Sequence, residues 1–150
     1  MPKTVSLRDR ALAYLARREH SRAELTRKLA QAGFASEEIA PVLDEFENKN
    51  WLSDQRFAES YVADHQIRYG AVKLTYELRQ RGIADSIIEQ VLTASRDTEL
   101  ARAREIWRKK FSTPPASSAE KARQMRFLQS RGFSIGTINQ TINLNDEPGY

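Results

Sequence analysis

The 150-residue sequence contains no cysteine. This absence excludes disulfides, thiol nucleophiles and thiolate metal sites. The sequence also lacks an apolar run long enough to cross a membrane, and its first ten residues, MPKTVSLRDR, lead into an amphipathic segment. Hydrophobic residues make up 40% and charged residues 29%, as in a globular protein with a charged surface. We therefore expect a cytoplasmic chain without a membrane partner.

Groups that could support catalysis are scarce as well. The two histidines, His20 and His65, lie in polar segments that are predicted to be helical. Asp44, Glu45 and Glu47 have no histidine near them, so a solvated acidic face is favoured over a metal or acid–base site. No phosphate-binding loop, dinucleotide fingerprint or nucleophile elbow occurs. The sequence predicts a protein that is not an enzyme, with no catalytic residue, metal site or cofactor.

The charge is distributed unevenly along the chain. The net charge is +4, from 24 basic and 20 acidic residues. Residues 101–131 hold nine Lys or Arg against two Glu, a local balance of +7, whereas residues 36–48 hold five carboxylates and no base. Such asymmetry favours a polyanion or an acidic protein surface as partner, although a solvated charged face is the simpler alternative.

A short phrase occurs three times, as RKLAQAGF at 27–34, YELRQRGI at 76–83 and RFLQSRGF at 126–133. The offsets between copies are 49 and 50 residues. The aligned positions are Leu29, Leu78 and Leu128; Gly33, Gly82 and Gly132; Phe34, Ile83 and Phe133; and Ile39, Ile88 and Ile138. This agreement at one spacing indicates a single unit used three times.

Helical periodicity surrounds each of these glycines. In the first copy, apolar residues before the glycine fall at i, i+4 and i+7, and those after it at i, i+3, i+4 and i+7. The glycine is therefore predicted to end a helix in the left-handed conformation. The next hydrophobe would then pack on the leucine, as in a Schellman motif. A phosphate-binding glycine loop is disfavoured because no strand precedes any copy.

A longer helix is expected before each pair of short ones, over residues 6–18, 54–68 and 97–111. Capping boxes are predicted at Ser21–Glu24 and Ser117–Glu120. Further N-caps are expected at Ser36, Ser53, Asp85, Asp97 and Ser134. Pro41 predicts that its helix starts late or has a distorted first turn. Trp51 and Trp107 are expected in the core, with Trp51 sealing a junction between repeats.

The predicted fold is all-α, with nine helices in three tandem three-helix repeats and no strand. The repeats cover residues 1–50, 51–95 and 96–143, with an internal linker at 111–118 and a flexible tail at 144–150. A unit of about 50 residues barely encloses a core, so neighbouring repeats are expected to stack as in a solenoid.

Four segments resemble the bacterial RecX regulatory proteins, in the right order and spacing. They are HSRAELTRKL at 20–29, NWLSDQRFAESYV at 50–62, ELRQRGI at 77–83 and KARQMRFLQSRGFS at 121–134. The resemblance implies an elongated, curved stack of three-helix repeats that binds the RecA recombinase in the groove of the RecA–DNA filament. It further implies restraint of filament extension, ATPase and strand exchange, and thus a role in DNA repair, recombination and SOS control. We expect a monomer.

The position two residues before each aligned leucine should point outward, which selects Arg27, Tyr76 and Arg126 as one row of binding residues. Guanidinium groups suit phosphates or carboxylates, and tyrosines can stack on bases or fill a protein pocket. The other candidates for partner or nucleic-acid binding are Arg17, Arg18, Arg22, Lys28, Tyr69, Arg108, Lys109, Lys110, Arg123 and Arg131. For the N-terminal arginines, ordinary surface charge is an equal alternative.

A competing hypothesis is a DNA-binding module, because three-helix units with a basic helix resemble helix-turn-helix domains. The third helices are acidic at 36–48, nearly neutral at 85–94 and uncharged at 134–142, which argues against reading of base edges. Non-specific contact with single- or double-stranded DNA stays open. A helical scaffold for another partner is the third hypothesis.

Overall fold

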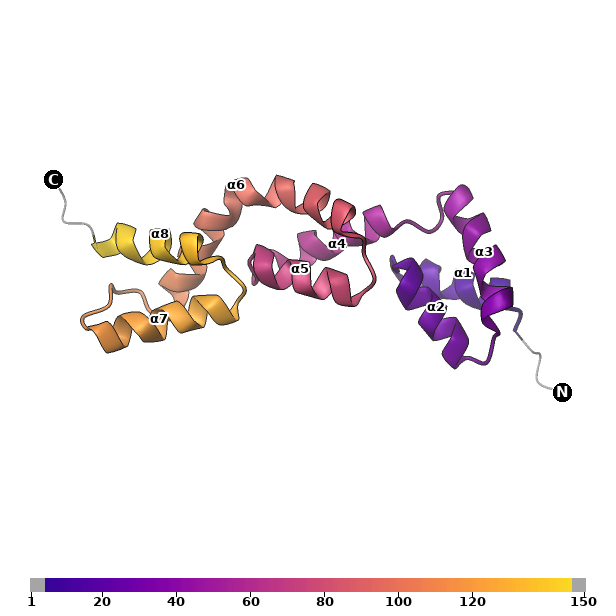
Figure 1. Ribbon diagram of the computed structural model, residues 1–150, viewed down its shortest axis with the longest axis horizontal. Coiled ribbons are helices and arrows are strands. Elements are labelled where there is room, and N and C mark those ends of the chain that lie inside the picture. Colours follow the sequence, from indigo (N-terminus) through magenta and orange to yellow (C-terminus); the bar gives the residue numbers. More distant parts are fainter. Residues whose placement is uncertain (1–4, 147–150) are drawn as a thin grey trace. The chain divides into compact units, whose positions relative to one another are not determined.

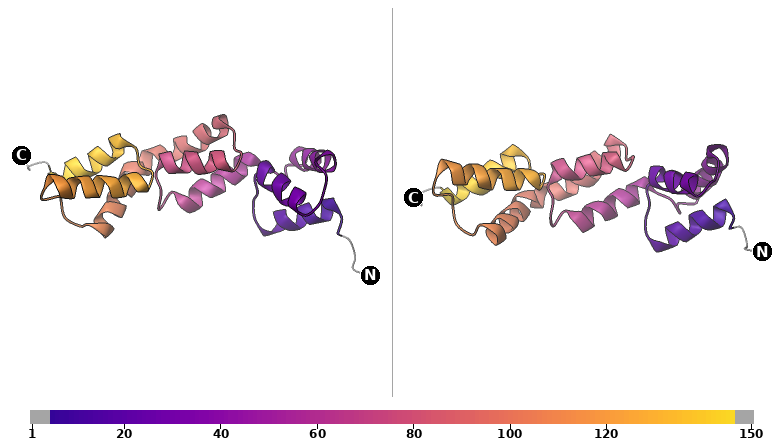
Figure 2. Two further views of the ribbon diagram at one scale, coloured as in Figure 1. Left: turned by 60° about the horizontal axis from the view of Figure 1, so that its bottom comes forward. Right: turned by 90° about the horizontal axis from the view of Figure 1, so that it is seen from below.

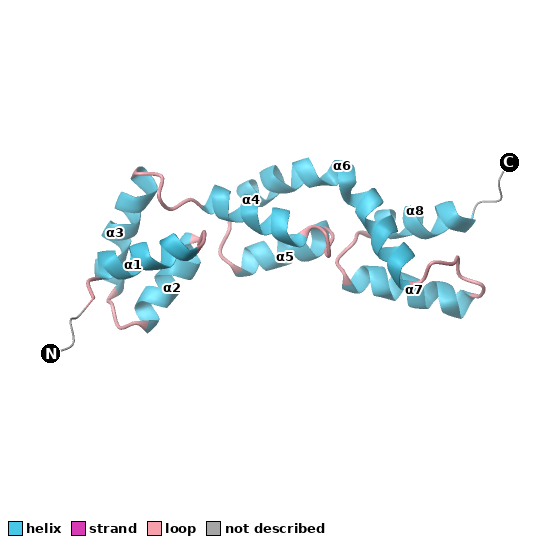
Figure 3. Cartoon of the chain, turned by 180° about the vertical axis from the view of Figure 1, so that it is seen from behind, coloured by secondary structure: helices cyan, strands magenta, loops and turns pink. Residues whose placement is uncertain are grey.

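The structure is a computed structural model that describes residues 5–146, and the side chains of residues 5–143. All regular structure in this part of the chain is helical (Figures 1 and 3). The helices are α1 (Leu7–Arg17), α2 (Arg22–Gln31), α3 (Ser36–Asn48), α4 (Asp54–His65), α5 (Ala71–Gln80), α6 (Asp85–Lys110), α7 (Ser118–Ser130) and α8 (Ile135–Asp146). The predicted all-α fold of tandem three-helix repeats is confirmed.

The predicted number of nine helices is wrong for the described residues, because α6 is one continuous helix of 26 residues. It supplies both the third helix of the middle repeat and the first helix of the last repeat. Residues 93–98, TASRDT, contain neither glycine nor proline, so no residue there breaks the helix. Asp97 therefore lies inside α6 and is not an N-cap.

The three aligned glycines end their helices as predicted. Gly33, Gly82 and Gly132 have φ angles of 103°, 79° and 85°. In each copy the N–H after the glycine donates to the carbonyl of the aligned leucine, at 3.1 Å for Leu29, 3.1 Å for Leu78 and 3.3 Å for Leu128. This six-to-one bond defines the Schellman motif, so that prediction is confirmed.

Most helix N-caps agree with the prediction. The hydroxyl groups of four serines accept the N–H three residues on, at 3.1–3.3 Å: Ser21, Ser53, Ser117 and Ser134. The predicted caps Ser36 and Asp85 are wrong, since each is the first helical residue. Of the two alternatives predicted from Pro41, the late start is wrong, because α3 begins at Ser36 and contains Pro41.

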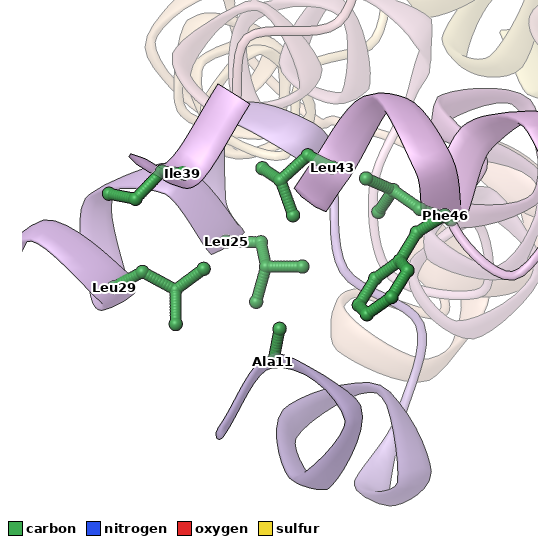
Figure 4. Packing of buried hydrophobic residues seen from close by; sticks show 7 residues of the cluster. Ala11, Leu25, Leu29, Ile39, Leu43 and Phe46 are labelled. Carbon is green, nitrogen blue, oxygen red and sulfur yellow. The ribbon is translucent and has the colours of Figure 1, made fainter. Parts of the chain in front are cut away.

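Buried residues of the repeats form the cores. In the first repeat Leu25 and Leu29 of α2 meet Leu43 and Phe46 of α3 over Ala11 of α1 (Figure 4). In the last repeat α7 and α8 lie side by side (Figures 1 and 2). Their core contains Ala103, Trp107, Leu128, Phe133, Ile138 and Ile142. Both cores use the positions that the repeat alignment selects.

The two tryptophans differ. Trp107 is buried as predicted, but Trp51 is 42% exposed and the prediction of a core position is wrong. The Trp51 ring packs against Phe46 in a tilted arrangement, with centroids 5.5 Å apart, and the Lys49 ammonium lies 4.7 Å from the Trp51 ring centroid. Its indole therefore covers the edge of the first core.

The chain divides into two compact units. Unit 1 comprises the residues up to Tyr61 together with Leu78–Ile88, and unit 2 comprises Val62–Glu77 together with the residues from Glu89 onward. The middle repeat thus contributes to both units. Each unit contains one junction between a pair of successive repeats.

In unit 1, the C-terminal end of α5 meets the N-terminal end of α2. The hydroxyl of Ser21, which caps α2, donates to the carbonyl of Arg81 at 2.8 Å. A Cβ added at Gly82 would clash with the Cβ of Ala23, so the two helix ends are in close contact. The carbonyl end of one helix thereby faces the amide end of another, which is the favourable direction for their dipoles.

Unit 2 repeats this junction between α7 and α5. The N–H groups of Gly70 and Val72 each donate at 2.9 Å, to the carbonyls of Arg131 and Gly132 respectively. A Cβ at Gly132 would clash with Lys73. The same glycine position therefore allows close contact in both junctions.

A carboxylate from the first helix of the following repeat completes each junction. Asp54 accepts the N–H of Arg22 at 2.8 Å, and Glu99 accepts the N–H of Ala71 at 2.7 Å. Glu99 also accepts a hydrogen bond from the hydroxyl of Thr137 at 3.3 Å. A carboxylate at a helix N-terminus satisfies an otherwise unpaired N–H and interacts favourably with the helix dipole.

The first three residues of the predicted flexible tail at 144–150 belong to α8. Helix α8 continues to Asp146, and residues 147–150 lie outside the described residues.

Candidate partner-binding surface

The outward positions predicted from the repeat alignment are exposed in all three repeats. Arg27 on α2, Tyr76 on α5 and Arg126 on α7 each lie two residues before a buried leucine. Tyr76 is 63% exposed. Among the described residues, none forms an ion pair with Arg27 or Arg126. The second helix of each repeat thus has an exposed side chain at this position that is available to a partner.

Two other N-terminal cations are held by carboxylates of the chain itself. Arg18 donates to both oxygens of Glu24, at 2.9 and 2.8 Å, and these hydrogen bonds raise the pKa of the Arg18 guanidinium. Arg22 donates to Asp44 at 2.7 Å and also to Glu47, which connects α2 to α3. These contacts stabilise the first repeat and leave both guanidinium groups less available to a partner.

Lys28 is likewise engaged. Its ammonium lies 2.9 Å from Nε2 of His20 and 5.1 Å from the centroid of the Tyr14 ring. Arg17, in contrast, is exposed at the end of α1 and forms no ion pair with any residue that the structure describes. Of the five N-terminal candidates, Arg17 and Arg27 keep their charge free for a partner.

His20 was expected in a polar helical segment, but it lies between α1 and α2 and is buried, with only 1% of its surface exposed. Its Nδ1 lies 3.0 Å from the carbonyl of Arg18. A carbonyl can only accept, so Nδ1 carries the proton and Nε2 accepts from Lys28. Burial lowers the pKa of His20 and favours the neutral ring. The histidine thus links Arg18, at the end of α1, to Lys28 in the last turn of α2.

Three of the six C-terminal candidates lie beside two phenylalanines in unit 2. Phe111 and Phe127 pack edge to face with their centroids 5.3 Å apart. Lys110 and Arg131 lie over the Phe127 ring at 5.5 and 5.2 Å, and Arg123 lies over the Phe111 ring at 5.3 Å. We call these five residues the cation–aromatic cluster. The sequence predicted the cations but not the phenylalanines that bring them together.

Several cations of this region, including Arg123 of the cluster, are partly neutralised by carboxylates. Arg123 forms two hydrogen bonds with Glu120, at 2.9 and 3.0 Å. Arg108 donates to Glu105 at 2.7 Å, and the ammonium of Lys109 lies 3.9 Å from the same carboxylate. These side chains are exposed or partly exposed, so water and salt screen the ion pairs and each contributes little to stability.

Tyr69 lies on the loop between α4 and α5, and two cations lie near its ring. The Lys73 ammonium lies 4.2 Å from the ring centroid and the Arg68 guanidinium 5.7 Å from it. The ring of His65 stacks on Tyr69 at 6.4 Å. The chain itself therefore covers much of a ring that was predicted to bind a partner.

One cation counted in the basic region has a structural role that the sequence did not reveal. Arg102 on α6 donates to the backbone carbonyls of Gln66, Tyr69 and Ser95, the last at 2.9 Å. Burial lowers the pKa of Arg102. Its charge stabilises the C-terminal end of α4, so the exposed basic surface is smaller than the local balance of +7 suggests.

Gln124 is a buried polar residue whose structural role was not predicted from the sequence. It accepts from the indole N–H of Trp107 at 2.8 Å and donates to the carbonyl of Thr113 at 3.2 Å. Gln124 lies four residues before Leu128, where the other repeats have Leu25 and Leu74. A polar residue at a core position was the signal that could have revealed this contact.

The described part of the chain contains no group of three or more His, Cys, Asp or Glu that could hold a metal ion. Between residues 5 and 146, no helix is long and apolar enough to span a membrane. Two open hollows lie on the surface of unit 1, and Arg27 lines one of them.

Comparisons with known proteins give a consistent result. The models of the first, second and third three-helix domains of RecX match residues 8–46, 53–92 and 97–142. A regulatory protein RecX of Leptothrix cholodnii is 46% identical over 142 residues, covering 95% of this chain and 90% of the relative. A regulatory protein RecX of Ralstonia nicotianae is 45% identical over 138 residues, covering 92% and 87%.

Solved structures agree in fold. The crystal structure of RecX from Lactobacillus salivarius superposes with a TM-score of 0.82 at 22% identity, covering 93% of this chain and 94% of the other. A second crystal structure of a regulatory protein RecX gives 0.79 at 23% identity, covering 94% and 72%. From the three domain matches and the identity to its relatives, the chain belongs to the RecX family of regulatory proteins.

Proposed function

We propose that this chain is a non-enzymatic regulator of the RecA recombinase. It binds along the groove of the RecA–DNA filament and restrains filament extension, ATPase and strand exchange, and so acts in DNA repair, recombination and SOS control. Membership of the RecX family supports the regulatory role. The partner follows from the family resemblance in the sequence.

The observation that carries the proposal is the exposure of Arg27, Tyr76 and Arg126 at equivalent points of the three second helices. A filament presents the same surface at regular intervals, and a protein with repeated faces can contact several subunits at once. Weak contacts on one scaffold act at a high effective concentration. A regulator of this kind is therefore effective below one molecule per RecA subunit.

The ATPase of DNA-bound RecA, measured with sub-stoichiometric amounts of this chain, tests the function. We expect inhibition, together with co-sedimentation of the chain with the filament. The combined variant Arg27→Glu, Tyr76→Ala and Arg126→Glu should lose both effects while keeping the helical circular-dichroism spectrum. Arg96→Glu is the control, because Arg96 is an exposed arginine of α6 outside these faces. Unchanged ATPase and no co-sedimentation for the wild-type chain would refute the function.

A second function, direct binding of DNA, is favoured by the cation–aromatic cluster of unit 2. Cations beside aromatic rings suit the phosphates and bases of single-stranded nucleic acid. A DNA titration at several salt concentrations tests it, because each neutralised phosphate contributes a log–log slope of about 0.7–0.9. Arg131→Gln should then reduce the slope, whereas a slope near zero for the wild type would leave RecA as the partner.

A further inference from the structure

An open hollow lies over the repeat junction of unit 1. It has a volume of about 460 Å³. Its lining residues are Arg22, Ala23, Thr26, Arg27 and Ala30 of α2, with Asp54 and Gly82. Three of the lining residues are small: Gly82 has no side chain, and α2 has alanine at positions 23 and 30.

Two of the three charged residues that line the hollow already form hydrogen bonds within the chain. Asp54 accepts the N–H of Arg22, and the Arg22 guanidinium is held by Asp44 and Glu47 of α3. Arg27 is the lining cation that forms no ion pair within the described part of the chain. The hollow therefore combines an apolar lining of small side chains with one available guanidinium group.

We propose that this hollow binds an acidic side chain of a partner protein. A guanidinium group binds a carboxylate through two parallel hydrogen bonds, and the alanines beside it accommodate the aliphatic part of a glutamate or aspartate. The inference rests on the proposed function, in which the partner is a subunit of the RecA filament.

A nucleic acid is a poorer occupant of the hollow. The hollow is lined by the carboxylate Asp54, and Arg22 is already held by Asp44 and Glu47. A strand would bring several phosphates to a hollow that offers one available cation, so most of its charges would meet no partner there. A single carboxylate on a protein surface brings one negative charge to Arg27 and is therefore repelled less by Asp54.

The equivalent face of α5 has a different chemistry. By the repeat alignment, Tyr76 takes the place of Arg27 and Val72 the place of Ala23. Both are exposed, Val72 by 58% and Tyr76 by 63%, and they are one helical turn apart. A contact made there buries apolar surface, so its strength should depend little on salt, in contrast to the contact at Arg27.

The test is the Kd of the chain for RecA filaments assembled on a single-stranded oligonucleotide, measured at low and high salt. Arg27→Glu should raise the Kd by about tenfold or more at low salt, with a smaller effect at high salt. Ala30→Trp, which fills the hollow without a change of charge, should raise it at both. The controls are Arg96→Glu and Ala13→Trp, exposed positions outside the hollow, which should stay within about twofold.

Three results would overturn the inference. The first is that Arg27→Glu and Ala30→Trp bind like the wild type. The second is that only Arg27→Glu weakens binding, because the charge would then act without the hollow. The third is that both variants weaken binding to the oligonucleotide without RecA, which would identify a phosphate as the occupant. Failure of the wild-type chain to bind the filament at all would instead refute the proposed function, and the inference with it.

Discussion

Replacing two of the helix-ending glycines by alanine separates helix termination from packing between repeats. Gly33 and Gly82 both have positive φ, so alanine at either site incurs left-handed strain of about 1–2 kcal/mol. Their surroundings differ. A Cβ at Gly33 has no atom within 4 Å, whereas one at Gly82 would clash with Ala23. Overpacking of this kind adds about 1–3 kcal/mol, so Gly82→Ala should be the more destabilising by about that amount.

Urea unfolding followed by circular dichroism at 222 nm gives the two free energies of unfolding, and the shared strain cancels in their difference. Gly132→Ala provides an internal check: its Cβ would lie 2.6 Å from the backbone nitrogen of Lys73, so it should behave like Gly82→Ala. Equal losses for Gly33→Ala and Gly82→Ala would refute the junction between α2 and α5 as the structure describes it.

Two further predictions concern buried polar groups. Gln124→Leu should lower the free energy of unfolding by about 1–3 kcal/mol in the same urea assay, because it leaves the Trp107 indole N–H unpaired. Gln129→Leu, at an exposed site on the same helix, is the control and should change the free energy of unfolding little. Equal effects of the two substitutions would contradict this prediction. The thermal midpoint should fall as the pH drops through 6.5, because the pKa of His20 is lowered in the folded state and the unfolded chain takes up its proton first. The contribution of neutral His20 to stability is thus complete above pH 6.5 and is lost below it. His20→Asn should therefore make the thermal midpoint depend less on pH in this range. An unchanged pH dependence of the midpoint in that variant would rule out His20 as the cause.

Local signals made the repeat and its helix ends predictable. A glycine preceded by leucine at four residues and followed by a hydrophobe specifies the Schellman motif within one short segment, so it can be recognised without knowledge of the rest of the chain. The serine caps are equally local. The continuity of α6 is not, because residues 93–98 are compatible with a helix or with a break, and packing decides between them.

The junctions between repeats were beyond prediction for a different reason. Asp54 and Arg22 are 32 residues apart, and Glu99 and Ala71 are 28 apart. No local sequence pattern in either segment indicates that it contacts the other. The binding residues show the same limit: the exposure of Arg27 follows from helical periodicity, but the pairing of Arg18 with Glu24 and of Arg22 with α3 depends on how the helices pack.

The most direct test of the account is a thiol-protection experiment, for which the absence of cysteine makes the chain well suited. Single variants Arg27→Cys, Tyr76→Cys, Arg126→Cys and Arg96→Cys are exposed to an alkylating reagent with and without RecA filaments. We expect RecA filaments to slow the alkylation of the cysteines at positions 27, 76 and 126 and to leave the rate at position 96 unchanged. Equal rates at all four positions, under conditions in which the chain sediments with the filament, would contradict it.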